Sequence, residues 1–182
     1  MPDNRRVAED IISCLVYPER FTLPQPVDVD NAAQQILALY EESGREGATF
    51  SLYFGNMSGQ PLYSVSVWPE RGTQPSDNEM SVSVIQDFIE ANSDVLNELN
   101  DPRCGIGLWY NADDNAVYLD IVALLPSRLE AVALAMQYDQ IAIFDLNALT
   151  DIETGGTGNG PSVMPPATKR LPRIRSQKDE EL

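Results

Sequence analysis

The sequence IGLWYNADDNAVYLDI at residues 106–121 decides the fold, because its pattern is that of a β-hairpin. Apolar side chains alternate in its first half, where Ile106, Leu108 and Tyr110 share one face, and alternate again in its second half. Residues 111–115, NADDN, separate the two halves and are typical of a tight turn, since Asn and Asp hydrogen-bond to nearby backbone groups. The pattern therefore predicts two antiparallel strands.

A helix and a further strand are expected after this hairpin. Ser127 followed by Glu130 forms a capping box, which marks the start of a helix. Four apolar residues of that helix are expected to face the core: Leu129, Val132, Ala133 and Met136. Residues 141–146 are almost continuously apolar and predict a buried strand. A strand–helix–strand order predicts a right-handed crossover and at least one parallel pairing.

The first hundred residues predict three helices and one more hairpin. Helical spacing of apolar residues occurs at 5–16, 31–43 and 82–99, the last with a break near residues 92–94. Alternating runs at 49–54 and 63–68 are separated by a Gly- and Asn-containing loop, which favours a hairpin. The predicted fold class is α+β, a mixed, mostly antiparallel sheet of about five strands with helices packed mainly on one face.

Composition divides the chain into three parts. Residues 1–27 are expected to form a helix and an extended connector, and residues 28–153 an acidic α+β domain. Residues 154–182 begin with TGGTGNG and continue with several prolines and basic residues, so they are expected to be a disordered Gly/Pro-rich linker and basic tail.

The distribution of charge is the most informative bulk property. Residues 1–160 carry 25 Asp and Glu against 7 Arg and no Lys, a net charge of −18, whereas residues 161–182 carry a net charge of +2. An acidic surface repels phosphates and anionic membranes, so the folded domain is not expected to bind nucleic acid directly. A basic protein surface is the expected partner, and the plainer alternative is that the acids only maintain solubility.

Several function classes are excluded because the chain has no histidine and because its two cysteines are far apart. The sequence contains no histidine, which excludes His-dependent triads and His-ligated metalloenzymes. Its two cysteines, Cys14 and Cys104, are far apart and are expected to be reduced thiols. No apolar run approaches the roughly 18 residues of a membrane span and no signal peptide is evident, so we expect a cytoplasmic protein. Its acidity favours a monomer or a weak homodimer. No cofactor is expected.

Three carboxylates support an alternative, catalytic hypothesis. Asp113, Asp114 and Asp120 lie within eight residues of one another and could hold a hard cation such as Mg²⁺. A carboxylate-based, metal-dependent hydrolase is therefore the alternative function. The competing interpretation is that the first two serve the turn and that Asp120 is either solvated or hydrogen-bonded to a neighbouring strand.

Aromatic residues and the basic tail are the predicted partner-binding elements. The strand faces opposite the aliphatic stripes carry Tyr53, Trp68, Trp109 and Tyr118. These aromatic side chains either form an exposed binding surface or are covered by a helix. The tail supplies the basic residues Lys169, Arg170, Arg173 and Arg175. The tail segment could contact a partner, fold back onto the acidic domain or stay solvated.

The segments WYN at 109–111, VYLDI at 117–121, QIAIFDL at 140–146 and TGGTG at 154–158 occur in an order that resembles a family of uncharacterised small proteins of bacteria and phages. The resemblance implies no known activity, cofactor or catalytic residue. Together with the charge, it favours a non-catalytic interaction or host-modulating factor that binds a basic partner. Mimicry of a nucleic acid is the sharper version of this hypothesis.

Overall fold

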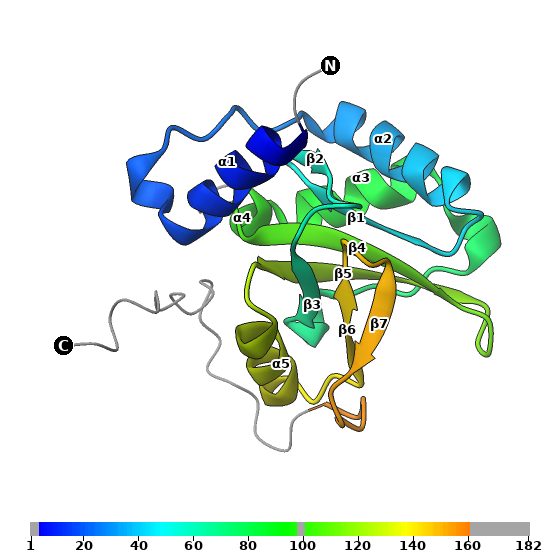
Figure 1. Ribbon diagram of the computed structural model, residues 1–182. Coiled ribbons are helices and arrows are strands. Elements are labelled where there is room, and N and C mark those ends of the chain that lie inside the picture. Colours follow the sequence, from blue (N-terminus) through cyan, green and yellow to red (C-terminus); the bar gives the residue numbers. More distant parts are fainter. Residues whose placement is uncertain (1–3, 98–100, 161–182) are drawn as a thin grey trace.

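The computed structural model describes residues 4–97 and 101–160 as one sheet with surrounding helices (Figure 1). The helices are α1 Asn4–Val16, α2 Val29–Glu42, α3 Val82–Ala91, α4 Ser93–Leu96 and α5 Arg128–Gln137. The strands are β1 Gly47–Ser51, β2 Gly55–Asn56, β3 Tyr63–Val67, β4 Cys104–Asn111, β5 Ala116–Leu125, β6 Ala142–Asp145 and β7 Thr150–Glu153. The predicted α+β class is confirmed, and so is the break after α3.

The sheet is larger than predicted and contains no parallel pair among the described residues. Its seven strands lie in the order β2-β1-β4-β5-β3-β6-β7, and every pairing is antiparallel. The sequence analysis missed β2 and β7 because each is too short to show an alternating pattern. The sheet curls strongly, so that β6 and β7 cross the direction of β4 and β5 in Figure 1.

The predicted β4–β5 hairpin is confirmed. Its register pairs Tyr110 with Val117, Leu108 with Leu119 and Ile106 with Ile121. These six side chains share one face of the sheet, and four of them (Ile106, Val117, Leu119 and Ile121) are completely buried. The local alternation of apolar residues thus identified both strands and the buried face correctly.

The predicted hairpin of residues 49–54 and 63–68 is wrong. The hydroxyl of Ser51 accepts hydrogen bonds from the backbone N–H groups of Tyr53 and Phe54, which ends β1 in a tight turn. β1 then pairs with β4, whereas β3 pairs with β5 on the other side of the central hairpin. The two strands therefore flank the β4–β5 pair instead of contacting each other.

The predicted parallel pairing is also wrong, although the crossover helix α5 is present. β3 pairs antiparallel with both β5 and β6, and it therefore lies between the two strands that α5 connects. β5 and β6 consequently run in the same direction without being neighbours. β3, which lies some 50 residues earlier in the sequence, occupies the position that a parallel neighbour would take.

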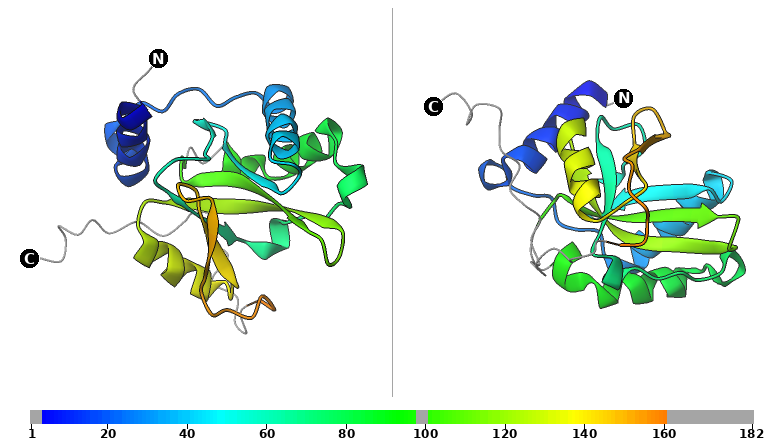
Figure 2. Two further views of the ribbon diagram at one scale, coloured as in Figure 1. Left: turned by 45° about the vertical axis from the view of Figure 1, so that its right-hand side comes forward. Right: turned by 90° about the horizontal axis from the view of Figure 1, so that it is seen from below.

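Two apolar clusters lie on opposite faces of the sheet, so the helices do not all share one face. The larger cluster joins α2, α3, α4 and α5 to strand residues such as Val65, Ile106 and Ile121. The smaller cluster joins Ile11 and Leu15 of α1 to side chains that include Val122 and Leu124 of β5. Figure 2 shows α1 separated from α2 by a long connector. Cys14 and Cys104 are buried free thiols.

The predicted buried stripe of α5 is wrong for Leu129, Ala133 and Met136, which are exposed, whereas Val132 is half-buried and does pack against the larger cluster. Leu129 and Met136 are 81% and 62% exposed, and the side chains that face the sheet are instead Ala131, Leu134, Ala135 and Tyr138. The helix sequence RLEAVALAMQ is apolar on two sides, so its periodicity alone cannot say which side is buried. Ser127 does cap the helix, since its hydroxyl accepts a hydrogen bond from the Glu130 N–H at 3.3 Å.

The first part of the predicted disordered linker, residues 154–160, is instead held against the end of α5. Thr157 donates through both its N–H and its hydroxyl to the Asp139 carboxylate, and the Gly158 N–H donates to the Asp139 carbonyl at 2.9 Å. A Cβ atom at Gly156 would lie 2.1 Å from the Gln140 carbonyl oxygen, so only glycine fits this close approach. Residues 161–182 lie outside the described residues.

Within the two described stretches, none of the helices combines the length and the apolar character that crossing a bilayer requires.

The two sides of α5 should respond differently to truncation. Leu134→Ala should lower the free energy of unfolding by about 2–4 kcal/mol, because it leaves a cavity against the sheet. Met136→Ala should change it by less than about 0.5 kcal/mol, because this side chain already lies in solvent. Urea denaturation of both variants measures the difference, and equal losses would contradict the observed orientation of α5.

Candidate functional site

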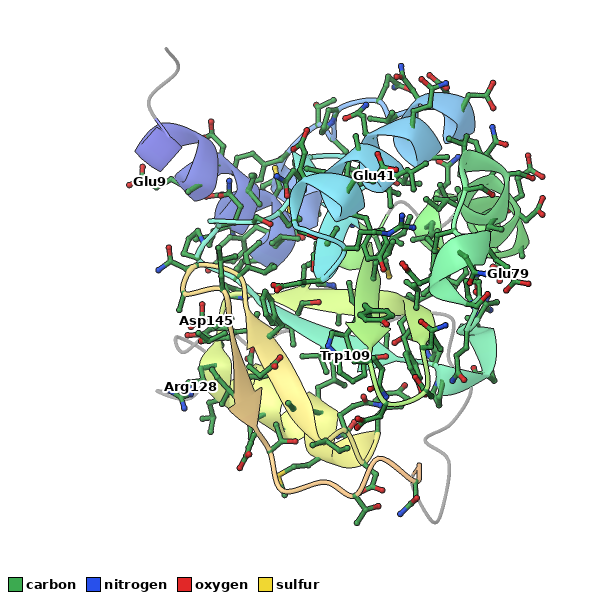
Figure 3. All side chains as sticks on the ribbon, turned by 90° about the vertical axis from the view of Figure 1, so that its right-hand side faces the viewer. Glu9, Glu41, Glu79, Trp109, Arg128 and Asp145 are labelled. Atoms are coloured by element: carbon green, nitrogen blue, oxygen red, sulfur yellow. The ribbon has the colours of Figure 1, made fainter. Side chains whose placement is uncertain are left out.

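The most exposed aromatic group on the sheet is a cross-strand pair of Trp109 and Tyr118. Trp109 of β4 lies directly opposite Tyr118 of β5, and their ring centroids are 5.4 Å apart with a tilted geometry. Trp109 is 54% exposed and Tyr118 is half-buried. Figure 3 looks towards the side of the molecule that carries Trp109. Large exposed aromatic side chains of this kind are enriched in protein interfaces.

Glycines keep the surroundings of Trp109 open. Gly47 of β1 is its neighbour across one strand boundary, and Gly107 lies two residues earlier on the same face of β4. Neither position supplies a side chain that could cover the indole. A Cβ atom at Gly47 would lie 2.7 Å from the Leu108 carbonyl oxygen, so the close approach of β1 to β4 itself requires glycine there.

Carboxylates lie next to the aromatic pair. The Tyr118 hydroxyl donates to Asp114 at 2.5 Å, and this hydrogen bond raises the pKa of Tyr118. Asp113 and Asp114 are both exposed in the turn that joins the two strands. We refer to Trp109, Tyr118, Asp113, Asp114 and Asp120 as the aromatic–acidic surface.

Asp120 is the least solvated carboxylate of this surface. It lies opposite Gly107 and diagonally across from Trp109. Burial raises the pKa of its carboxyl, and a hydrogen bond with Ser66 acts in the opposite direction. A Cβ atom at Gly72 would lie 2.5 Å from its Oδ1 atom, so the carboxylate rests against this backbone segment and would have to move if residue 72 carried a side chain. The missing side chain at position 72 therefore makes room for Asp120, whereas the one missing at position 107 makes room for Val122, whose Cγ1 atom would lie 2.7 Å from a Cβ atom there.

The other two predicted aromatic residues do not belong to this surface. Tyr53 is buried after the turn that ends β1, and its hydroxyl donates to the Asn97 carbonyl at 3.4 Å. Trp68 is buried in the main core, because its left-handed backbone conformation, with φ of 49°, takes it out of the strand alternation. Of the four aromatic residues predicted to bind a partner, the structure thus brings together Trp109 and Tyr118.

The three carboxylates of the alternative metal site do not form a group. Asp114 accepts from Tyr118 and from the Ala116 N–H, while Asp120 lies farther along β5 between glycines. In residues 4–97 and 101–160, no three His, Cys, Asp or Glu side chains are arranged to hold a metal ion. The tail residues predicted to bind a partner, Lys169, Arg170, Arg173 and Arg175, lie outside the described residues.

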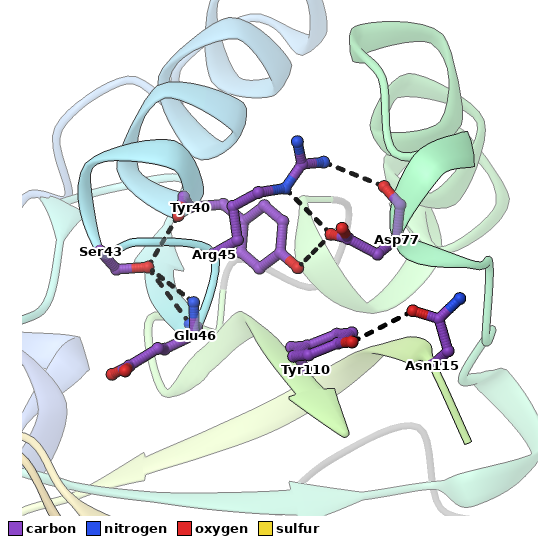
Figure 4. Close-up of polar contacts among 8 residues, drawn as sticks. Tyr40, Ser43, Arg45, Glu46, Asp77, Tyr110 and Asn115 are labelled. Carbon is purple, nitrogen blue, oxygen red and sulfur yellow. Dashed lines mark hydrogen bonds and ion pairs between the residues drawn. The ribbon is translucent and has the colours of Figure 1, made fainter. Parts of the chain in front are cut away.

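A second polar cluster, which the sequence analysis missed, is satisfied internally. The hydroxyl of the fully buried Tyr40 donates to Asp77 at 2.8 Å, and Arg45 donates to the same carboxylate oxygen at 2.9 Å (Figure 4). Burial and the Asp77 carboxylate raise the pKa of Tyr40 to about 12. The cluster joins the end of α2 to the loop before α3. Sequence separations of 32 and 37 residues leave no local signal for it.

Comparison with known proteins gives no relative for this chain: no family model, no curated protein and no solved structure matches it. The resemblance to uncharacterised bacterial and phage proteins therefore stays a prediction.

Neutralising Asp120 should stabilise the protein near neutral pH. Because the folded-state pKa is raised, the folded protein binds more protons than the unfolded chain, and stability falls as pH rises above the ordinary value of 3.8. Asp120→Asn removes this loss, so its advantage over the wild type should be present at pH 7 and shrink towards pH 4. Urea denaturation across this range measures it.

Asp113→Asn is the matched control for this prediction, because it removes the same charge from an exposed position. An Asp120→Asn variant that is less stable than Asp113→Asn at pH 7 would show that the carboxylate is needed for the fold.

Proposed function

We propose that this protein is a non-catalytic interaction protein that binds a basic protein partner at the aromatic–acidic surface. The observation that carries the proposal is the exposure of Trp109 in a pair with Tyr118, whose hydroxyl donates to Asp114, within a stretch (residues 1–160) of net charge −18. A partner's Lys or Arg side chain could stack on the indole and reach the carboxylates at its edge.

Internal ion pairs strengthen the electrostatic part of the proposal. Arg45, Arg71 and Arg103 pair with Asp77, Asp94 and Asp101, at distances of 2.8 or 2.9 Å. The guanidinium of Arg71 also lies 5.9 Å from the centre of the Trp68 ring. Since residues 1–160 contain only seven Arg and no Lys, these contacts leave few cations to neutralise the many exposed carboxylates.

The combination of aromatic and acidic groups is better suited to a cationic side chain than either group alone. A carboxylate supplies charge that steers a basic partner but is screened by salt. The indole adds a flat, partly desolvated contact whose cation–π energy is about 0.5–2 kcal/mol. The partner should therefore be rich in Arg and Lys. Proteins that bind nucleic acid have this composition, so the aromatic–acidic surface could act by mimicking a nucleic acid.

Binding of a synthetic Arg- and Lys-rich peptide of about ten residues should depend on Trp109. Isothermal titration calorimetry should show Trp109→Ala weakening the affinity by about five- to thirtyfold, which corresponds to a loss of about 1–2 kcal/mol. Affinity should also fall steeply between about 50 and 300 mM salt. Phe21→Ala removes another exposed aromatic side chain and should leave the affinity unchanged.

A matched pair of charge variants separates a local site from diffuse attraction. Asp113→Asn with Asp114→Asn removes two charges at the surface, and Asp151→Asn with Glu153→Gln removes two charges from the exposed edge strand β7. The first pair should weaken peptide binding several-fold more than the second. Equal effects, or no effect of Trp109→Ala, would refute binding at the aromatic–acidic surface.

Capture from a cell lysate then tests the class of partner. Proteins retained by the wild type and lost with Trp109→Ala should be basic, and competition with duplex DNA should release those whose nucleic-acid site is being occupied. Retained proteins that are acidic or neutral would contradict the proposal.

A further inference from the structure

The outer side of α5 presents an apolar stripe to solvent. The stripe consists of Leu129, Ala133 and Met136, which are spaced by four and three residues and therefore lie on one side of the helix. All three are exposed, whereas the opposite side of α5 packs on the sheet. Figure 1 shows α5 at the rim of the molecule, and no other labelled helix or strand covers its outer side.

This stripe is free of carboxylates in a protein dominated by them. The one acid of α5 is Glu130, whose Oε2 atom is buried without a hydrogen-bond partner in the described chain, and burial raises its pKa. The exposed polar neighbours of the stripe on α5 are Arg128 and Gln137. Figure 3 shows Arg128 extending away from the ribbon. Electrostatic repulsion between two copies of this acidic chain is therefore small where α5 faces α5.

We propose that two copies of this chain associate through α5, with the two helices packed antiparallel about a twofold axis near Ala133. The stripe is self-complementary in this arrangement. At a rise of about 1.5 Å per residue, Leu129 lies about 6 Å from Ala133 in one direction and Met136 about 4.5 Å in the other. The twofold axis places Leu129 of one copy against Met136 of the second, and the small Ala133 side chain lets the helices approach.

Charge complementarity favours the same antiparallel orientation. Arg128 is the first residue of α5, so the twofold axis brings it to the C-terminal end of the second helix. That end carries the partial negative charge of the helix and, just beyond it, the Asp139 carboxylate. Hydrogen bonds from the Thr157 hydroxyl and N–H lower the pKa of Asp139, which keeps this carboxylate ionised. A parallel arrangement would instead place the two Arg128 side chains together.

The contact is a single helix pair, so the association should be weak. Stable interfaces bury about 800 Å² on each partner, more than one short helix face offers. Each copy also carries a net charge of −16, and their general repulsion is screened by salt. Dimers should consequently form at concentrations of about 100 μM and become more abundant when salt is raised, opposite to the behaviour expected for the binding of a basic peptide.

Cysteine cross-linking of the full-length chain tests the geometry. A mixture of the single variants Leu129→Cys and Met136→Cys should form a disulfide-linked dimer at least fivefold faster than either variant alone, because identical positions lie roughly 10 Å or more apart. Ala133→Cys should link to itself. Ala112→Cys, at the exposed tip of the β4–β5 turn, is the control for random collision. The native cysteines are buried and should not compete.

Efficient linking of Leu129→Cys to itself would overturn the antiparallel orientation, and no linking above the Ala112→Cys control would overturn the dimer. Sedimentation equilibrium provides an independent readout. Leu129→Glu should abolish the rise in average mass with concentration, whereas Leu149→Glu, at another exposed leucine, should not. A wild-type chain that stays monomeric up to about 500 μM would also overturn the proposal. The chain would behave in this way if another of its own segments covered α5.

Discussion

Eight successive cross-strand pairs, from Cys104–Ala123 to Asn111–Ala116, join β4 to β5 at the centre of the sheet. Their register determines which residues face each side, because a shift of one position would exchange the two faces. On one side it buries Ile106, Leu119 and Ile121 beneath the helices. On the other it exposes Trp109 opposite Tyr118. The main core and the candidate binding surface are thus two faces of the same antiparallel pair.

Glycine positions determine how this second face is used. Gly47 and Gly107 leave the indole of Trp109 uncovered, and Gly72 makes room for the Asp120 carboxylate. Farther along β5, larger residues on the same face pack against α1. One sheet face therefore combines a covered apolar end with an open aromatic and acidic end. The outer side of α5 is a separate surface with the opposite character, apolar and free of carboxylates.

The sequence predicted contacts between residues close together in the chain, but it did not predict strand pairings between distant segments. The β4–β5 hairpin was predicted with its buried face, because both strands and the turn lie within about 20 residues and carry matching signals. The pairing of β1 with β4 and of β3 with β5 and β6 was not, since strands far apart in sequence can join any open edge. The four predicted aromatic residues separated for a different, local reason, because tight backbone turns removed Tyr53 and Trp68 from the strand pattern.

Composition and local periodicity determined the strong acidity, the absence of histidine chemistry, the helices and the central hairpin, because each depends on residue identity or on neighbours within a few turns. Tertiary contacts determine which side of α5 is buried, which aromatic residues stay exposed and where Arg45 and Arg71 are paired. These outcomes depend on contacts between segments far apart in sequence, such as Arg45 and Asp77, which are 32 residues apart. The two apolar sides of α5 look equivalent in sequence and differ only in the surface that they meet.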